Sequence, residues 1–328
     1  MSAMVTAPKP EAHVKHVEVK KEGLWSRYRL PLLFLIPALL IIAGFFVAPV
    51  LLTLAISATN MSVSTGLKGF SWIGTGNYQE ILHSPWIPMI LKNTLFYVFG
   101  TLIVFNVGLA LVIAIACAFI PERVSGLIRM VWLLPRITPS VVYVLMMKYM
   151  AADEPYGILN QLLAPLGVHP QNWMYVKPWL FILALNGLVG ASMGMILFSS
   201  AIQSIPSSQF LAAEIDGASN WKIIRRIILP QLKWAILFTT VYQTLSLLTS
   251  FEYIMLTTNG GPGFYTTEVW SLFAYHTALS NYYGNAKFGL GAALAVVLVV
   301  LGIVISFIYL KFFKFRSMVT DPKIEINA

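Results

Sequence analysis

Six long runs of apolar residues, separated by more polar segments, dominate the chain and predict six membrane-spanning helices. The runs cover roughly residues 30–57, 92–119, 128–151, 179–202, 234–257 and 288–313. Each has close to the roughly 20 apolar residues that a helix needs to cross the hydrocarbon core of a bilayer. We therefore expect an all-α integral membrane protein, with a transmembrane domain at residues 30–313 between polar tails at residues 1–29 and 314–328.

The composition supports a membrane protein. Of the 328 residues, 58% are hydrophobic and only 11% are charged, whereas soluble domains carry about 25% charged residues. The net charge of +9 could suggest a nucleic-acid partner, but in a membrane protein it more simply reflects orientation, and we expect no such partner. Cys117 is the single cysteine, so no internal disulfide can form.

The Lys and Arg residues are distributed unevenly between the two sets of connecting segments. With the N-terminus inside, the inner segments carry 16 of the 22 Lys and Arg residues, and the outer segments carry four, Lys68, Lys92, Lys177 and Lys287. Cytoplasmic segments of membrane proteins are enriched in these residues. The bias predicts a multi-pass protein whose membrane-spanning helices contact membrane lipid. Both termini and the loop of residues 203–233 are predicted to lie in the cytoplasm.

The loop of residues 203–233 has the pattern of a helix, a turn and a second helix. Pro206 suits the first turn of a helix, and Asp216-Gly217 predicts its end, because glycine tolerates the left-handed conformation found there. Ser219 or Asn220 can cap the second helix, and Pro230 is expected to stop it. Its apolar edge is predicted to consist of Trp221, Ile224 and Ile228. By spacing alone, the loop could equally be an ordinary basic hairpin between two membrane helices.

The residues of this loop closely resemble the EAA motif of permease subunits of ABC importers. The resemblance lies in Leu211-Ala212-Ala213, then Gly217 after three further residues, and finally Leu229-Pro230. It implies that the loop is the coupling helix, which docks into a cleft on a cytoplasmic ATPase, with Glu214, Asp216 and Ala218 at the same surface. The family has Glu where this chain has Leu211. Glu214 lies one turn later on the same face, and the sequence leaves open whether it replaces that carboxylate.

Three outer segments also resemble the sugar-type permeases of the maltose permease family: Gly74 to Tyr78, Gly157 to Asn160, and Thr258 to Gly263. The resemblance covers residues 30–313 and implies the six-helix fold of a type I ABC importer permease in the bacterial cytoplasmic (inner) membrane. It implies a second homologous permease, two ATPase subunits that hold ATP and Mg, an extracytoplasmic solute-binding protein, and a carbohydrate substrate. This chain itself would hold no cofactor and catalyse no reaction.

Motifs for chemistry are scarce. The sequence has no phosphate-binding loop, no His-Glu-x-x-His and no cysteine pair, so we expect neither ATP nor a metal site in this chain. Gly190 to Gly194 fits the Gly-x-Ser-x-Gly pattern of serine hydrolases, and an intramembrane hydrolase using Ser192 is an alternative. The motif lies inside an apolar run, and His276 is the only histidine after it, which favours helix packing. A secondary transporter would need ion-coupling residues and usually a repeat, and neither is evident.

Two polar patterns within the apolar runs are candidates for a substrate path. Asn186, Gly190 and Met193 share one face of the fourth run, and Gln243, Ser246 and Ser250, flanked by Tyr242, form a stripe on the fifth. Such groups suit a sugar, although hydrogen bonds between helices would explain them as well. The resemblance adds Leu247 and assigns Gly190, Met193 and Ser246 to the family's cavity positions.

Charged residues inside the runs are further candidates, because burying a charge in a membrane is costly. Arg136 lies between Pro135 and Pro139, and Glu252 lies in the outer part of the fifth run. They could contact substrate or form a structural ion pair. Lys148, near the outer end of the third run, is expected to extend its amine to the membrane surface. Arg136 and Lys148 leave room for an acidic substrate such as a uronate oligomer.

Overall fold

The computed structural model describes residues 24–153, 155, 157–279 and 284–312, so most of the N-terminal tail and the whole C-terminal tail lie outside it. The described residues are nearly all helical, and the one β-bridge among them joins Thr59 and Trp72. The chain forms two units, Met1–Leu52 and Thr53–Ala328. The predicted all-α class is confirmed.

The first unit contains one run of helix that continues along the chain into the second unit. It consists of α1 (Leu24–Ile42), the π-helical turn η1 (Ala43–Val47) and the beginning of α2 (Ala48–Ser57). Leu33–Ser57 is 25 residues long and contains an 18-residue stretch with a mean hydropathy of 2.7, enough to cross a membrane. The predicted first span is confirmed, and its helix begins earlier, at Leu24.

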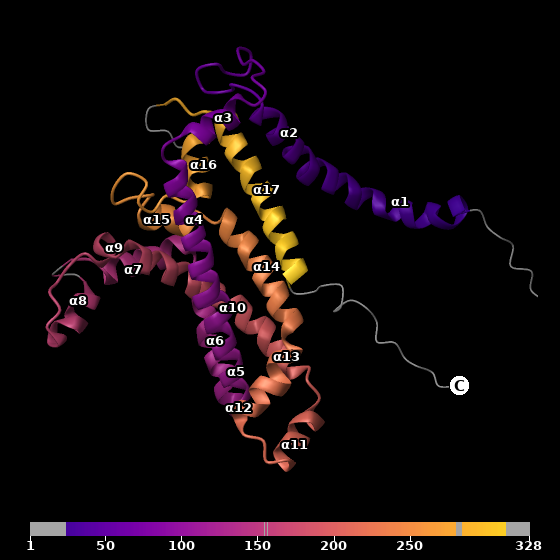
Figure 1. The fold of residues 1–328 in the computed structure, drawn as a ribbon, viewed down its shortest axis with the longest axis vertical. Helices are drawn as coiled ribbons and strands as arrows, with labels where there is room; N and C mark the ends of the chain where they lie inside the picture. The colour runs from indigo at the N-terminus through magenta and orange to yellow at the C-terminus, as the bar shows by residue number, and fades with distance from the viewer. Residues whose placement is uncertain (1–23, 154, 156, 280–283, 313–328) are drawn as a thin grey trace, which may run out of the picture. The chain divides into compact units, whose positions relative to one another are not determined.

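Four long helical segments form the bundle of the second unit (Figure 1). The first runs without interruption through α4 (Ile87–Thr101), the π-helix η2 (Leu102–Leu109) and α5 (Ala110–Ala118). The others are α10 (Pro178–Gln203), α14 (Lys233–Thr249) and α17 (Phe288–Phe312). The helix α10 packs along η2 and α5, and α14 lies against η2 and α17. The second, fourth and sixth predicted spans are confirmed, the second beginning five residues before the predicted start.

The third predicted span is not straight. It consists of α6 (Glu122–Ile137) and α7 (Ser140–Met150), which meet at an angle of 99°. Pro139 explains the break, because its ring disfavours helical backbone at the preceding residue. Thr138 is accordingly extended, with ψ of 132°. The bend turns α7 out of the direction of α6.

The fifth predicted span is also interrupted. The helix α14 ends at Thr249, and the short helix α15 (Glu252–Thr257) follows an extended Ser250. The Ser250 carbonyl accepts a hydrogen bond of 3.1 Å from Ser271, which compensates the missing helical bond at this break. Among the described residues, four helices are long and apolar enough to cross a membrane, or five with α6 and α7 counted as one. The 17-residue α14 is shorter than these.

Glycines on α10 allow close helix packing in the bundle. A Cβ on Gly187 would overlap the Phe105 ring, and one on Gly190 would overlap the Asn106 side chain. Small residues let membrane helices approach closely, where van der Waals contact replaces the hydrophobic effect as the main attraction. The glycines of the fourth run therefore position α10 against η2.

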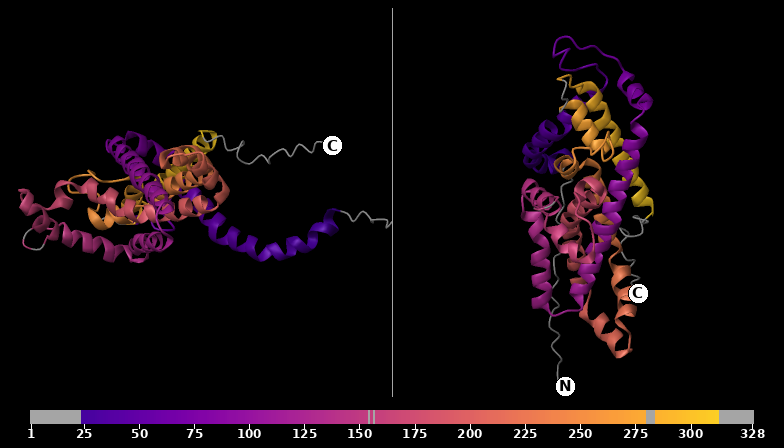
Figure 2. Two further views of the ribbon diagram at one scale, coloured as in Figure 1. Left: turned by 90° about the horizontal axis from the view of Figure 1, so that it is seen from below. Right: turned by 90° about the vertical axis from the view of Figure 1, so that its left-hand side faces the viewer.

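The shorter helices lie at opposite ends of this bundle (Figures 1 and 2). One end holds α3 (Gly76–His83) and α16 (Trp270–Ala278), and the other holds α11 (Ser207–Ile215), α12 (Asn220–Ile223), η4 (Ile224–Ile228) and α13 (Leu229–Gln231). A further group follows α7: α8 (Ile158–Leu163), η3 (Ala164–Leu166) and α9 (Trp173–Val176).

Buried asparagines fasten the connecting segments near α3, α8 and α16. Each donates its side-chain amide to two or more backbone carbonyls: Asn77 to Ser57 and Thr59, Asn160 to Ala152 and Gln171, and Asn93 to Tyr265, Thr266 and Glu268. Buried carbonyls without a donor cost about 1–3 kcal/mol each. Asn77 of α3 and Asn160 of α8 thus order the neighbouring connecting segments through side-chain hydrogen bonds.

We expect Gly187→Ala to lower the melting temperature of the detergent-solubilised protein. The added methyl group overlaps Phe105, and overpacking typically costs about 1–3 kcal/mol. Gly126→Ala is the matched control, because Gly126 is an exposed helical glycine with no atom within 4 Å of an added Cβ. Alanine is the better helix former, so this variant should be as stable as the wild type or more so. Equal melting temperatures for the two variants would contradict the packing argument.

Candidate coupling surface and substrate path

The predicted helix–turn–helix of the 203–233 loop is present in the structure. The helix α11 ends at Ile215, Asp216 follows it, and Gly217 has φ of +66°, in the left-handed region. The Ala218 N–H reaches back to the Ala213 carbonyl at 2.8 Å, and the Asp216 N–H to the Ala212 carbonyl at 3.0 Å. This closed glycine turn sets the direction in which the second helix leaves.

The second loop helix differs from the prediction in two respects. Pro230 does not stop it, since the helix continues through α13 to Gln231 and only Leu232 separates it from α14. The π-helical turn η4 precedes the proline, which cannot donate the usual backbone hydrogen bond. Trp221 is not on the buried edge: it is 67% exposed, whereas Ile223 and Ile228 are buried. The π turn changes the helical period that the sequence pattern assumed.

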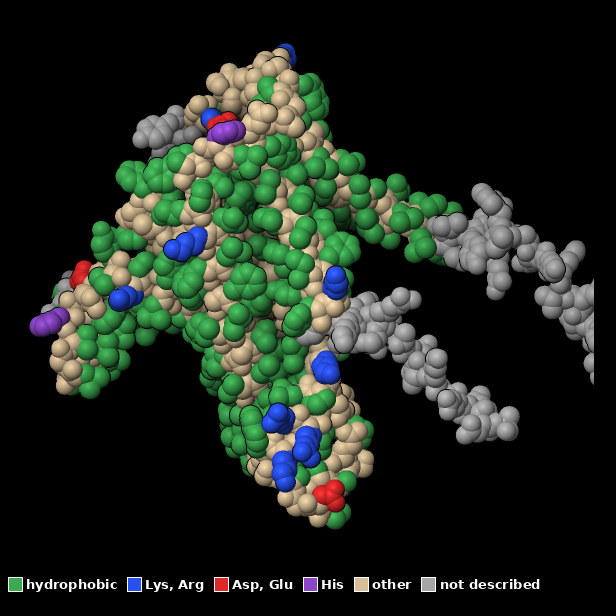
Figure 3. Space-filling model, viewed as in Figure 1, with side chains coloured by type: hydrophobic (Ala, Val, Ile, Leu, Met, Phe, Trp, Pro, Cys, Tyr) green, Lys and Arg blue, Asp and Glu red, His purple; other side chains and the backbone are tan. Residues whose placement is uncertain are grey.

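The loop presents an exposed surface at its end of the bundle. Leu211, Ile215 and Trp221 are 58%, 86% and 67% exposed. Other exposed members are Ala212, Glu214, Asp216, Gly217 and Pro230, while Ala213, Ala218 and Leu229 are half-buried. Lys222, Arg225 and Arg226 are exposed too, and Figure 3 shows Lys and Arg side chains gathered at this end. Large apolar side chains beside basic ones suit a protein partner better than water.

The inner side of the loop is joined to the bundle. Ile223 and Ile228 belong to one buried apolar cluster with Phe198 and Ile202 of α10 and Ala114 of α5, and Phe210 and Ala213 of α11 pack against it. A displacement of the loop helices would therefore displace the side chains of α5 and α10 that pack against them.

Two groups of polar side chains lie inside the bundle. In the first, the Asn186 amide donates to the Tyr97 hydroxyl and, at 3.1 Å, to Ser250, and Tyr97 donates to Ser250 at 3.3 Å. Tyr97 is fully buried and Asn186 is 8% exposed. This group joins α4 and α10 to the break after α14.

The second group joins η2, α10 and α14. The Asn106 amide donates to Gln243 at 3.2 Å, and the Gln243 amide donates to the Gly190 carbonyl at 3.0 Å. Asn106 is fully buried and Gln243 is 5% exposed. Tyr97 and Asn106 were missed by the sequence reasoning, although an asparagine within an apolar run is a signal that could have found one of them.

The remaining candidates do not form the predicted stripe. Ser246 is exposed, Leu247 is buried in the apolar core, and Ser250 lies beyond the end of α14 rather than on its face. Tyr242 is exposed and stacks on Phe238 at 6.1 Å between ring centroids. On α10, Met193 is half-buried. The path candidates are thus split between buried helix contacts and exposed positions.

Arg136 and Glu252 are exposed and do not pair with each other. Glu252 accepts a hydrogen bond from Ser140, the first residue of α7, and no ion pair links it to Arg136 among the described residues. Lys148 is half-buried and donates to the Leu256 carbonyl at 3.0 Å. The hydrogen bonds of Glu252 and Lys148 hold α7 against α15.

The geometry gives the hydrolase alternative no support. Ser192 is fully buried within α10, and its hydroxyl donates to the Val189 carbonyl of the same helix at 2.6 Å. The His276 ring lies 2.9 Å from Glu268 and 3.1 Å from Asn259. In this same segment, burial and then the nearby Glu268 raise the pKa of Tyr265. The described residues contain no group of three or more His, Cys, Asp or Glu suited to a metal.

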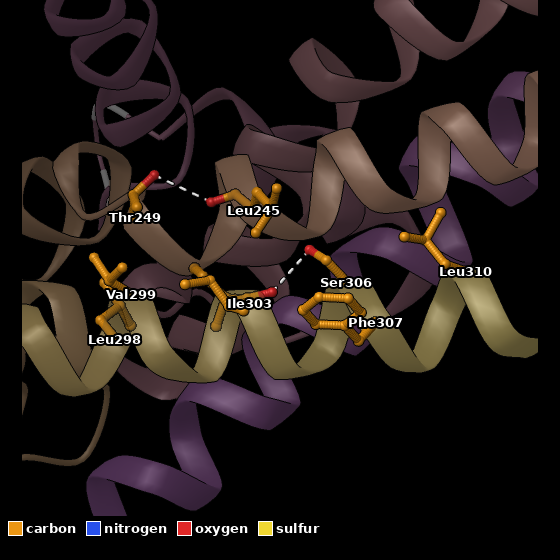
Figure 4. Close-up of a pocket in the computed structure, with 10 residues that line it drawn as sticks. Leu245, Thr249, Leu298, Val299, Ile303, Ser306, Phe307 and Leu310 are labelled. Atoms are coloured by element: carbon orange, nitrogen blue, oxygen red, sulfur yellow. Dashed lines mark hydrogen bonds between the residues drawn. The ribbon is translucent and has the colours of Figure 1, made fainter. Parts of the chain in front are cut away.

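A groove between α14 and α17 has a volume of about 340 Å³ (Figure 4). Its walls include Leu245, Leu298 and Phe307, and the hydroxyls of Thr249 and Ser306 donate to carbonyls of their own helices. A groove without available polar groups does not suit a hydrated sugar.

The family comparison decides the class of protein. A family model described as "Binding-protein-dependent transport system inner membrane component" matches residues 106–316. The chain belongs to this family. It is therefore a multi-pass membrane subunit of a binding-protein-dependent transport system, and the predicted ABC permease is confirmed.

A curated relative and two solved structures resemble this permease along most of its length. The trehalose/maltose transport system permease protein MalF of Thermococcus litoralis is 29% identical over 88% of this chain and 95% of its own. A bacterial ABC transporter for import of the acidic polysaccharide alginate has a TM-score of 0.75 at 21% identity, covering 90% of this chain and 98% of that one. The alginate transporter in complex with an alginate pentasaccharide-bound periplasmic protein also scores 0.75, at 22% identity, over 88% and 96%. The two structures confirm the importer permease fold.

We expect Gln243→Leu to lower the melting temperature of the permease. The change leaves the buried Asn106 amide and Gly190 carbonyl without this partner, and a buried unsatisfied group costs about 1–3 kcal/mol. Ser246→Ala, three residues along the same helix, is the control, because Ser246 is exposed and its loss should leave the melting temperature unchanged. A Gln243→Leu protein as stable as wild type would show that these hydrogen bonds do not support the fold.

Proposed function

We propose that this permease forms part of an ABC importer that moves a carbohydrate, specifically an acidic oligosaccharide, into the cytoplasm. It pairs with a second homologous permease, its 203–233 loop docks into a cleft on one of two ATPase subunits, and a solute-binding protein delivers substrate from outside. ATP and Mg are held by the ATPase subunits, so the chain catalyses no reaction itself. The observation that carries the proposal is the family match together with an exposed glycine-turn loop joined to the bundle.

The coupling role follows from the two sides of the loop. Outward, Leu211, Ile215 and Trp221 offer an apolar contact for an ATPase cleft. Inward, the apolar cluster transmits displacement of α11 and α12 to α10 and α5. The helix α10 carries Asn186 and Gly190, whose hydrogen bonds reach α4 and α14. Closure of the ATPases would thus shift the bundle between inward-open and outward-open arrangements.

The acidic substrate is supported by charge and by likeness. Arg136 is exposed beside the 99° bend, and it is not ion-paired among the described residues. A cation near a low-dielectric membrane interior attracts a carboxylate strongly. The relative MalF is named for trehalose and maltose, which supports a carbohydrate substrate. The solved transporter of the same fold imports an acidic polysaccharide, which supports an acidic one.

Topology can be tested with single cysteines in a Cys117→Ser background. The charge bias predicts that Asn220 faces the cytoplasm and Lys68 the outside, and both are exposed. A membrane-impermeant thiol reagent applied to intact cells should label Lys68→Cys and spare Asn220→Cys, and permeabilised cells should label both. Labelling of Asn220→Cys alone in intact cells would reverse the orientation and remove the basis for ATPase docking.

Gly217→Val should abolish transport and substrate-stimulated ATP hydrolysis while the protein still reaches the membrane. No atom lies within 4 Å of a Cβ built on Gly217, so the cost is backbone strain at φ of +66° rather than a clash. Gly217→Asn is the matched control, because asparagine adopts this conformation far more readily, and it should retain most activity. Full transport by Gly217→Val would contradict the coupling role.

Glu214→Ala tests whether this exposed carboxylate takes the place of the glutamate that the family has at Leu211. If Glu214 contacts the ATPase, its loss should reduce transport and stimulated ATP hydrolysis together. Glu122→Ala, at an exposed acidic residue outside this loop, controls for a general change of charge. Unchanged transport by Glu214→Ala would show that docking does not use this carboxylate.

A further inference from the structure

A small pocket lies apart from the helix contacts described above, where α7, α9 and the segment after α15 meet. Its volume is about 270 Å³. Lys148 contributes from α7, Asn172 and Tyr175 from the α9 region, and Thr258 and Pro262 from the segment after α15. These residues lie near or in segments that the charge bias assigns to the outside of the membrane.

The pocket has one fixed positive charge. The Lys148 ammonium group is half-buried and uses one of its three N–H donors on the Leu256 carbonyl at 3.0 Å. No Asp or Glu is among the described residues that line the pocket. The bond to Leu256 positions the cation, and its other donors can serve an anionic oxygen.

The other groups suit a sugar ring. The Tyr175 side chain is 65% exposed, so its ring can cover the apolar face of a sugar. Asn172 accepts the Tyr175 N–H at 3.2 Å through its side-chain oxygen, which orients its NH₂ group as a donor. Met174, buried at 7% exposure, provides an apolar wall. A cation, an amide donor and an aromatic ring converge in one small space.

We propose that this pocket binds one anionic sugar unit on the outer side of the permease, with its carboxylate at Lys148 and its ring against Tyr175. The proposal rests on the proposed function, since it assigns the charge of the carbohydrate to a particular site. The pocket spans α7 and the segment after α15, and the hydrogen bonds Ser140–Glu252 and Lys148–Leu256 already join α7 to α15. Ligand there adds a contact between the parts that follow the two helix breaks.

Binding can be measured on the complete importer in detergent, without its solute-binding protein. The probes are trisaccharides of galacturonate, glucuronate and mannuronate, each compared with its uncharged methyl ester by saturation-transfer NMR. At least one acid should bind at least tenfold more tightly than its ester. Lys148→Gln should reduce affinity for the acid to that for the ester, whereas Lys148→Arg should preserve the preference.

Two further variants separate charge from stacking and from general effects. Tyr175→Ala should weaken binding of the acid and binding of the ester by the same factor, because stacking does not depend on the carboxylate. Lys177→Gln removes a nearby exposed lysine that does not line the pocket and should change neither. Melting temperatures recorded in parallel identify any variant that is misfolded.

Several outcomes would overturn the proposal. It fails if no acid binds better than its ester, or if Lys148→Gln, folded as judged by its melting temperature, keeps the preference. It also fails if Lys148→Gln slows uptake of neutral and acidic sugars equally in proteoliposomes with a binding protein, since the lysine would then serve protein docking. Failure of the proposed function itself looks different: the wild-type importer would take up no carbohydrate at all.

Discussion

Backbone and side-chain polar groups inside this bundle must find partners within the protein, because a membrane interior offers no water to satisfy them. The contact between α10 and η2 meets this requirement for the Asn106 NH₂ group and for both polar groups of Gln243, while the buried Asn106 Oδ1 has no partner among the described residues. Gly187 and Gly190 let the two helices approach closely, and Asn106 and Gln243 then form a hydrogen-bonded bridge that ends on the Gly190 carbonyl. A Cβ on Gly190 would overlap the Asn106 side chain, so close packing and the hydrogen bond to Gln243 depend on the same residues.

The same constraint explains why the chain can break its helices at two points. At Thr138–Pro139 the bend is fixed by proline geometry, and Ser140 just beyond it is held by Glu252. At Ser250 the break is held by Tyr97, Asn186 and Ser271. Both breaks involve the second unit's polar contacts, and the segments that follow them, α7 and α15, pack against each other. A ligand or partner that favours one arrangement of this pair acts on both breaks at once.

The loop at the other end of the bundle is built on a different principle. Its glycine turn requires a left-handed backbone at Gly217, and its inner side is purely apolar packing with α5 and α10. The polar bridges of α10 and this apolar cluster therefore lie on one continuous helix of 26 residues. A helix held by hydrogen bonds along one part and by side-chain packing along another transmits displacement as a rigid element.

Much of this protein was decided by its sequence. Runs of about 20 apolar residues predict membrane helices, glycine after Asp216 predicts the turn of the 203–233 loop, and the residues of that loop resemble the family to which the chain belongs. The helix breaks were harder to infer, because Pro139 was visible in the sequence but the extended Ser250 is stabilised by residues from three other helices. The prediction of a continuous polar stripe on the fifth run was wrong for the same reason.

Periodicity assumes a continuous α-helix, and neither the π turn at Ile224–Ile228 nor the break at Ser250 keeps that period. The partners of Gln243 and Asn186, and the meeting of Lys148 with Tyr175, were decided only by the tertiary structure. A hydrophobic pattern specifies which residues enter the membrane. It does not specify which polar side chains of different helices form hydrogen bonds with each other, since that depends on how closely the helices pack.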